Sequence, residues 1–272
     1  MPTFLAPDQV TLHYDTRGAG RTRVLLAGGA ARHPEYLGDL AGLSGHHVIP
    51  HQRGVGHSPG PGLPYWDLAS DVEALRTHLG LSHLTIVAHS AGTRLAMAYA
   101  ARYPDQISAM LLITPPSAHL VDAESDIEEL RAARRGDPVF DDALAAMVAG
   151  PDLTDDEAFT AWHLASAPVT YAAWTAVEQE HARVGRQHLA AARAFFDGEP
   201  PADLAERLSA VRAPVRIVGG AQDCTTGVAP VAALADLFPA GEVVVLEECG
   251  HYPWVEQPEL FREVAEEFLY RV

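Results

Sequence analysis

A strand-like run that leads directly into a serine and then into a helix constrains this chain more than any other feature. The run Leu84–His89 is rich in β-branched and apolar residues, and an alanine-rich helical pattern begins at Ala91. Ser90 lies between them, within the small-residue sequence Ala88–Gly92. Small neighbours are needed where a sharp, strained turn between a strand and a helix lifts a serine hydroxyl clear of a sheet. The run therefore predicts a nucleophile elbow, although a serine here could also simply cap the helix.

A nucleophilic serine needs a base, and the base needs an acid that orients it. Two later strand-like runs end in suitable residues: Pro214–Gly220 leads into Asp223, and Glu242–Leu246 leads into His251. One helix-like stretch separates the two runs, so both loops should open at the same edge of a parallel sheet. The order Ser, Asp, His along the chain predicts a triad of Ser90, Asp223 and His251. Asp122 is the only alternative acid.

Further motifs make the chain resemble the α/β-hydrolase superfamily, and within it the branch of proline iminopeptidases and related small-molecule hydrolases. Leu25–Gly29 followed by Tyr36 resembles the H-G-G-P-G motif of that branch, and His51–Ser58 resembles its D-Q-R-G-x-G-x-S motif. Gly250–Phe261 is similar to the last loop and helix of the superfamily. The chain departs from the branch at Ala27, Ala30, Ala31 and His51. The resemblance implies an α/β-hydrolase fold, with a mostly parallel central sheet flanked by helices and an inserted helical cap.

The distribution of strand signals along the chain agrees with one core and one insertion. Strand-like and helix-like runs alternate up to Thr114, which predicts βαβ units in a doubly wound sheet. From Ser117 to Glu199 the strand signal disappears and the sequence is helical and alanine-rich. We therefore predict a core formed by residues 1–116 and 200–272, and a helical cap formed by residues 117–199.

Backbone amides near Ser90 should stabilise a developing oxyanion. The amide of Ala91 follows the nucleophile at a helix N-terminus, where the helix dipole favours negative charge. The second donor should come from the loop after the first buried strand, with Gly29 preferred and Gly28 and Ala30 as other candidates. His89 we expect to pack beneath the nucleophile.

The predicted cap offers two kinds of substrate contact. The aromatic residues Trp162, Tyr171 and Trp174 could line an apolar acyl pocket, or could simply pack between helices. Glu178 and Glu180 would be the available partners for a substrate ammonium if the enzyme were an aminopeptidase, but they also suit a solvated helix face. From this pattern we expect an apolar pocket and a preference for uncharged acyl substrates.

Composition excludes several other classes. The formal net charge of −17 argues against nucleic acid or an anionic membrane as a partner. No signal peptide and no membrane-spanning run of apolar residues is recognisable, so we expect a cytoplasmic protein. The two cysteines, Cys224 and Cys249, exclude a disulfide framework, and no H-E-x-x-H motif indicates a metal. We expect neither a metal nor another cofactor, and a small molecule as the partner.

The sequence thus predicts a serine hydrolase that acts through an acyl-enzyme on a small ester, lactone or amide. Three alternatives remain at this point: a proline iminopeptidase-like aminopeptidase, an enzyme of acyl transfer, cyclisation or C–C cleavage in specialised metabolism, and a non-catalytic binding protein with a hydrolase fold. An intact triad speaks against the last of these.

Overall fold

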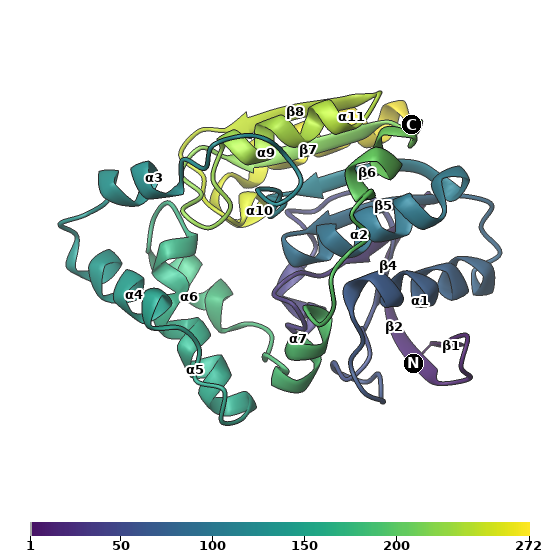
Figure 1. Ribbon diagram of the computed structural model, residues 1–272, viewed down its shortest axis with the longest axis horizontal. Coiled ribbons are helices and arrows are strands. Elements are labelled where there is room, and N and C mark those ends of the chain that lie inside the picture. Colours follow the sequence, from purple (N-terminus) through teal and green to yellow (C-terminus); the bar gives the residue numbers. More distant parts are fainter. Residues whose placement is uncertain (1) are drawn as a thin grey trace.

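The computed structural model describes residues 2–272 and is built around one eight-stranded sheet (Figure 1). In spatial order the strands are β1-β2-β4-β3-β5-β6-β7-β8. The pairs β1/β2 and β2/β4 are antiparallel, and all the other neighbours are parallel. The strands are β1 Thr3–Leu5, β2 Thr11–Ala19, β3 Thr22–Leu26, β4 Gly45–Pro50, β5 Leu84–His89, β6 Ile107–Ile113, β7 Val215–Gly220 and β8 Gly241–Leu246. The prediction of a mostly parallel sheet is confirmed.

Helices connect the parallel strands and cover the sheet. The α-helices are α1 Tyr65–His78, α2 Ala91–Arg102, α3 Ile127–Ala133, α4 Pro138–Ala149, α5 Asp156–Ser166, α6 Ala176–Arg183, α7 Leu189–Phe195, α8 Leu204–Ser209, α9 Ala229–Ala233, α10 Pro253–Glu256 and α11 Pro258–Arg271. Short 3₁₀ turns are η1 Pro34–Leu37, η2 Pro104–Gln106, η3 Ala167–Thr170 and η4 Leu234–Leu237. Among residues 2–272 no helix has both the length and the apolar character to span a bilayer.

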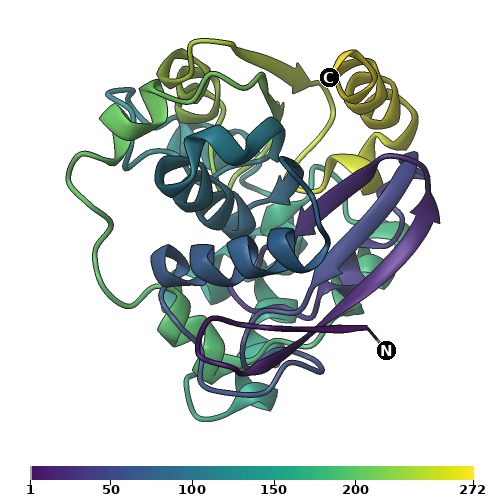
Figure 2. The same ribbon diagram turned by 90° about the vertical axis from the view of Figure 1, so that its right-hand side faces the viewer.

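The two faces of the sheet bury two separate hydrophobic clusters. Along β5, Ile86 and Ala88 belong to the cluster beneath α1 and α2, whereas Val87 belongs to the cluster beneath α11. Successive side chains of a strand point to opposite faces, so a strand covered on both sides is apolar throughout. Figure 2 shows α1 and α2 side by side in front of the sheet, and α11 on its other side. This double covering explains why the parallel strands appear in the sequence as continuous apolar runs.

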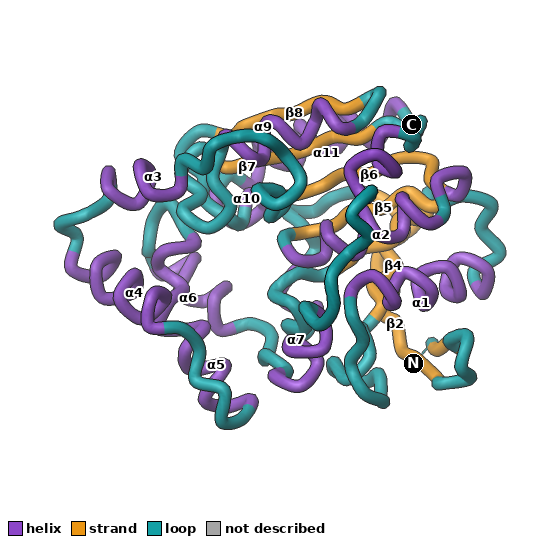
Figure 3. Tube along the Cα trace, in the orientation of Figure 1, coloured by secondary structure: helices purple, strands orange, loops and turns teal. Residues whose placement is uncertain are grey.

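Residues 117–199 form helices, turns and loops, apart from an isolated bridge between Arg32 and Gln187 (Figure 3). In Figure 1 the helices α3–α6 lie beyond the ends of the strands that point toward the left of the view. Those are the carboxyl ends of the parallel strands, where ligands bind in open α/β sheets.

Candidate active site

The turn between β5 and α2 has the strained backbone expected of an elbow. Ser90 has φ 50° and ψ −124°, a conformation that non-glycine residues rarely adopt. A side chain at Gly92 would place its Cβ 2.3 Å from the carbonyl oxygen of Leu26, so only glycine fits there. Gly28 approaches from the neighbouring loop, and a Cβ there would lie 2.9 Å from the Cβ of Ser90. The close approach of these backbones fixes the serine at the edge of the sheet.

Ser90, His251 and Asp223 form one continuous chain of hydrogen bonds. The Oγ of Ser90 lies 2.8 Å from Nε2 of His251, and Nδ1 of His251 lies 2.7 Å from Oδ2 of Asp223. The carboxylate accepts the Nδ1 proton, so Nε2 carries the lone pair that accepts the serine hydroxyl proton. The three residues predicted from the sequence therefore lie in hydrogen-bond contact in the predicted order.

Asp223 is completely buried and held by its own loop. Its Oδ1 accepts the backbone N–H groups of Thr225 and Thr226 at 2.8 and 3.2 Å, and its Oδ2 also accepts the hydroxyl of Thr226 at 2.5 Å. Burial acts to raise the pKa of Asp223, but the charge and hydrogen bond of His251 outweigh it and hold this pKa below its usual value. Asp122, the alternative acid, is exposed.

The half-buried carboxylate of Glu256 holds the loop that carries His251. The side chain of Glu256 accepts the amides of Gly250 and Tyr252 at 3.0 Å each, on either side of the histidine, and the amide of Ala172 at 2.6 Å. Burial raises the pKa of Glu256 to about 7, although these three N–H groups act in the opposite direction. The backbone of His251 is anchored as well, because its amide donates to the carbonyl of Thr170 at 2.8 Å.

Of the four candidate oxyanion donors, Gly29, Ala30 and Ala91 line the cavity that holds Ser90, and Gly28 does not. Gly29 and Ala91 line the same cavity as Ser90, and Ala91 is the first residue of α2, so its amide has no acceptor within the helix. The prediction for Gly28 is wrong, because its amide donates to the hydroxyl of Tyr36 at 2.6 Å and is not available to a substrate.

The loop that carries Gly29 is strained and is held in place by Arg32. Ala30 and Ala31 have φ of 43° and 88°, in the left-handed region that costs non-glycine residues about 1–3 kcal/mol. The guanidinium of Arg32 donates to the carbonyls of His181, Ala182 and Val184, which come from α6 and the residue after it. These bonds fasten the loop to the helical segment.

His89 is buried next to Ser90 in the chain and links two parts of the site. Its Nε2 donates to the carbonyl oxygen of His251 at 3.0 Å, so Nδ1 is the acceptor for the hydroxyl of Tyr36 at 2.8 Å. Burial, followed by the charge of His251, lowers the pKa of His89 well below its usual value. The neutral imidazole and Tyr36 therefore connect the Gly28 amide to the backbone of His251.

The serine opens into a cavity of about 470 Å³ between the sheet edge and the helical segment. The core contributes residues such as Gly29, Ser90, Arg94 and His251. The helical segment contributes mainly apolar and aromatic side chains, which are Met147, Leu153, Phe159, Trp162, Leu189, Ala192 and Phe196. The cavity is therefore largely apolar, with Ser90 at its floor.

Of the five cap residues proposed for substrate binding, one lines this cavity. Trp162 does so, stacked on Phe159 with ring centroids 5.8 Å apart. Tyr171 does not line the cavity but stacks on Tyr252, which does. Trp174 also lies outside the lining and packs against Tyr171, with ring centroids 5.5 Å apart. The sequence showed the aromatic residues but could not show which helix face meets the cavity.

The predictions for Glu178 and Glu180 as cavity residues are also wrong. Glu178 is buried, and its carboxylate accepts hydrogen bonds from the amide and the hydroxyl of Thr175. The two residues form a capping box at the start of α6. Glu180 is exposed. A threonine followed three residues later by a glutamate is itself a helix-capping signal in the sequence. This signal predicts the position of Glu178 better than a role in substrate binding does.

Sequence reasoning missed several polar groups of the cavity, above all Arg94, His163 and Gln187. Arg94 stands one helical turn after Ser90, and this spacing could have identified it. Burial, followed by the charge of Arg32, lowers the pKa of His163 to about 3, so its ring is neutral at neutral pH. No sequence signal marks Gln187.

Both cysteines are free and buried, and they belong to different hydrophobic clusters. Burial raises the pKa of each thiol. This agrees with small packing residues rather than nucleophiles.

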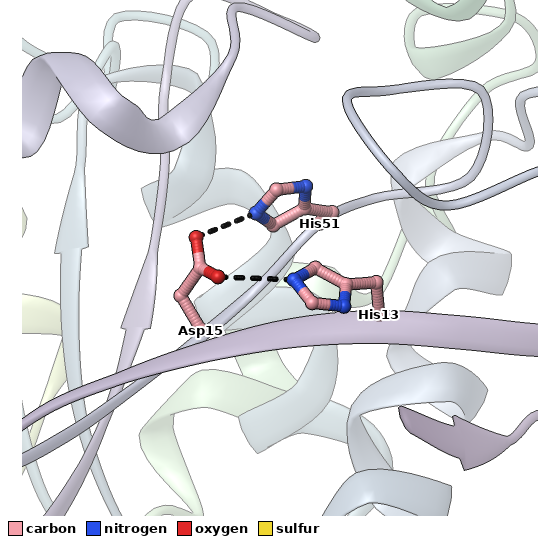
Figure 4. Close-up of side chains that lie close together, drawn as sticks. All are labelled: His13, Asp15 and His51. Carbon is pink, nitrogen blue, oxygen red and sulfur yellow. Dashed lines mark hydrogen bonds and ion pairs between the residues drawn. The ribbon is translucent and has the colours of Figure 1, made fainter. Parts of the chain in front are cut away.

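Within residues 2–272, one group of side chains has the spacing to hold a metal ion: His13, Asp15 and His51. Figure 4 shows both imidazoles directed at the carboxylate, with each Nε2 3.0 Å from a different oxygen of Asp15. Nδ1 of His51 accepts the backbone N–H of His57 at 3.2 Å, so the proton of this ring is on Nε2. A metal needs the Nε2 lone pair, whereas here Nε2 donates to Asp15. The absence of a metal stays a prediction.

The whole chain resembles known proteins. The family model of the alpha/beta hydrolase fold matches residues 24–258. A cis-3-alkyl-4-alkyloxetan-2-one decarboxylase of Shewanella oneidensis is 30% identical over 129 residues, which are 44% of this chain and 41% of the relative. An N-formylmaleamate deformylase of Pseudomonas putida is 26% identical over 266 residues, or 93% of each chain. A proline iminopeptidase of Xylella fastidiosa is 39% identical over 69 residues, 24% of this chain and 22% of the relative.

A solved structure with the same fold is a thermophilic esterase of Thermogutta terrifontis, with a TM-score of 0.73 and 20% identity over 99% of this chain and 98% of the esterase. The chain belongs to the alpha/beta hydrolase fold family. The chain matches less than half the length of the decarboxylase and of the iminopeptidase. The names of the relatives describe different reactions, so membership of the family does not by itself select one.

Proposed function

We propose that the protein is a serine hydrolase that cleaves a small ester, lactone or amide through an acyl-enzyme. The observation that supports this most strongly is the hydrogen-bond chain from Ser90 through His251 to Asp223 at 2.8 and 2.7 Å, on a strained elbow at the floor of a cavity. A serine that only capped α2 would need neither a histidine on its Oγ nor a buried carboxylate behind that histidine.

In the proposed reaction, Oγ of Ser90 bonds to the acyl carbon while its proton passes to Nε2 of His251. The π electrons of the carbonyl move to its oxygen, which receives hydrogen bonds from the amides of Ala91 and Gly29. When the carbonyl re-forms, the bond to the leaving group breaks, and that group takes the proton from His251. Water then repeats the sequence on the acyl-enzyme and releases the acid. Asp223 stabilises the imidazolium in both halves.

The helical segment, residues 117–199, acts in this proposal as a cap. Its apolar side chains form the far wall of the cavity, so a bound substrate is removed from water and the oxyanion contacts are strengthened. Arg32 joins the cap to the loop that carries Gly29. It thereby holds the proposed oxyanion donor Gly29 in a fixed position relative to the cap side chains that line the cavity.

An aminopeptidase is less well supported. A substrate ammonium in a closed pocket needs a carboxylate, since an unpaired buried charge costs several kcal/mol. Within the described part of the chain, the cavity lining contains neither aspartate nor glutamate. Acyl transfer or C–C cleavage would use the same three residues, and the fate of the acyl group then distinguishes the reactions.

A fluorophosphonate probe tests the proposal. It should label Ser90, and Ser90→Ala should abolish both labelling and the hydrolysis of p-nitrophenyl esters. Ser82→Ala, which changes an exposed serine, is the matched control and should behave as the wild type. Labelling that persists in Ser90→Ala would refute the assignment.

A further inference from the structure

The cavity above Ser90 has a charge opposite to that of the protein as a whole. The chain carries a formal net charge of −17, yet three arginines line the cavity and, among residues 2–272, no acidic side chain does. The arginines are Arg32, Arg94 and Arg193. A concentration of one sign of charge in a cavity with low-dielectric walls attracts ligands of the opposite sign.

Arg94 is the arginine whose charge is least compensated. It stands four residues after Ser90 on α2 and is half-buried. The Nε atom of Arg94 is buried and has no hydrogen-bond partner. The side chain of Arg94 makes one hydrogen bond, between Nη2 and Nδ1 of His119, at 3.5 Å. Burial, followed by the charge of Arg94, lowers the pKa of His119 to about 4, so this imidazole does not add a second charge at neutral pH. Within residues 2–272 Arg94 forms no ion pair with a carboxylate.

The other two arginines have different surroundings. The guanidinium of Arg32 is occupied by the carbonyls of the cap, and that of Arg193 is exposed and donates to the carbonyl of Leu153. Among residues 2–272 neither Arg32 nor Arg193 forms an ion pair with a carboxylate, so both leave a net positive charge near the cavity. Arg94 is therefore the half-buried arginine of the lining whose guanidinium is not occupied by backbone carbonyls.

A second polar group in the cavity is also unsatisfied. Gln187 is 1% exposed, and neither the nitrogen nor the oxygen of its amide has a hydrogen-bond partner. A buried polar group without a partner costs about 1–3 kcal/mol, and an ordered water or a polar group of a ligand can supply the missing hydrogen bonds. Arg94 and Gln187 thus add polar groups to a lining that is otherwise largely apolar.

We propose that the substrate carries a carboxylate in addition to the bond that is cleaved, and that Arg94 binds this carboxylate. This inference rests on the proposed function and replaces the expectation of uncharged substrates. Ser90 and Arg94 line the same cavity four residues apart in the chain, so we expect a short carbon chain between the two ends of the substrate. An arginine–carboxylate pair in a desolvated pocket forms two charge-assisted hydrogen bonds and rejects a methyl group at the same place.

Two esters with the same six-carbon acyl chain test the inference: monomethyl adipate, which carries a carboxylate, and methyl hexanoate, which ends in a methyl group. In the wild type, kcat/KM for monomethyl adipate should exceed that for methyl hexanoate by about tenfold to a hundredfold, as expected for a charged hydrogen bond. In Arg94→Gln the ratio should fall to about one, and Arg94→Lys should restore part of it. Arg212→Gln, an exposed arginine outside the cavity, should keep the wild-type ratio.

The same esters can be used as protecting ligands against the fluorophosphonate probe. Monomethyl adipate should slow the labelling of Ser90 at a lower concentration than methyl hexanoate in the wild type, but not in Arg94→Gln. Labelling without any preference for the anionic ester, in turnover and in protection, would overturn the inference and leave the serine hydrolase intact. Failure of the probe to label Ser90 at all would instead refute the proposed function.

Discussion

Replacing Asp223 by asparagine tests whether the hydrogen-bond chain works as a triad, because the loop geometry dictates how the amide would sit. Oδ1 accepts two backbone N–H groups, from Thr225 and Thr226. An asparagine keeps both bonds only with its oxygen at that position. The reverse orientation would direct its NH₂ group at two donors and leave them unpaired, at about 1–3 kcal/mol each. The NH₂ group of the variant must therefore face Nδ1 of His251.

That orientation reverses the tautomer of the histidine. Nδ1 of His251 becomes an acceptor, so the ring proton moves to Nε2, which can no longer take the proton of Ser90. We expect kcat to fall by about 10³–10⁴, equivalent to roughly 4–5.5 kcal/mol of lost transition-state stabilisation. The assay is the hydrolysis of a p-nitrophenyl ester, together with the rate of fluorophosphonate labelling at Ser90.

The matched control is Asp122→Asn, which alters the exposed alternative acid and should leave kcat within about twofold of the wild type. Thermal unfolding of both variants verifies that the fold is retained. A value of kcat for Asp223→Asn within tenfold of the wild type, or an equal loss in Asp122→Asn, would refute the tautomer argument.

Three further changes test the surroundings of the triad. Gly92→Ala should destabilise the fold by at least about 1–3 kcal/mol in urea unfolding, because the new Cβ meets a carbonyl oxygen of β3 at 2.3 Å; wild-type stability would contradict the close packing. Tyr36→Phe removes the hydroxyl that pairs with both the Gly28 amide and His89, so kcat should fall by a larger factor than KM changes. A kcat equal to that of the wild type would show that the hydrogen bonds of Tyr36 do not contribute to turnover. The pKa of Glu256 is higher in the folded than in the unfolded chain, so the folded state binds more protons between about pH 4.5 and 7. The free energy of unfolding should therefore decline by up to roughly 3 kcal/mol as the pH rises through this range. Glu256→Gln should lose this decline in urea unfolding, and an unchanged pH dependence would refute the shift.

Several features of the protein follow from short stretches of sequence. A β-branched run, a serine between small residues and an alanine-rich helix determine the elbow, because strand preference, strained turn and helix preference are each properties of neighbouring residues. The order of Ser90, Asp223 and His251 could be predicted for a related reason. Each of the three residues lies in the loop or turn after the carboxyl end of a strand. Parallel strands bring these ends to one edge of the sheet.

Other features depend on pairs of residues that are far apart in the chain. The amide of Gly28 is occupied because it donates to the hydroxyl of Tyr36 at 2.6 Å. The position of Gly29 depends on the hydrogen bond from Arg32 to the carbonyl of Val184. No periodicity or motif in the sequence indicates either contact. The two partners are 8 and 152 residues apart, and they meet only because of how the helices and loops pack.

The lining of the cavity shows the same limit. Helical periodicity indicates that Trp162, Tyr171 and Trp174 have buried faces, but not which of them faces the substrate. The net charge of −17 is a property of the whole chain and does not reveal that, among residues 2–272, three arginines and no acidic side chain line the cavity. Local sequence fixes backbone conformation through short-range sterics, whereas the chemistry of a cavity is fixed only when segments distant in the chain are packed against one another.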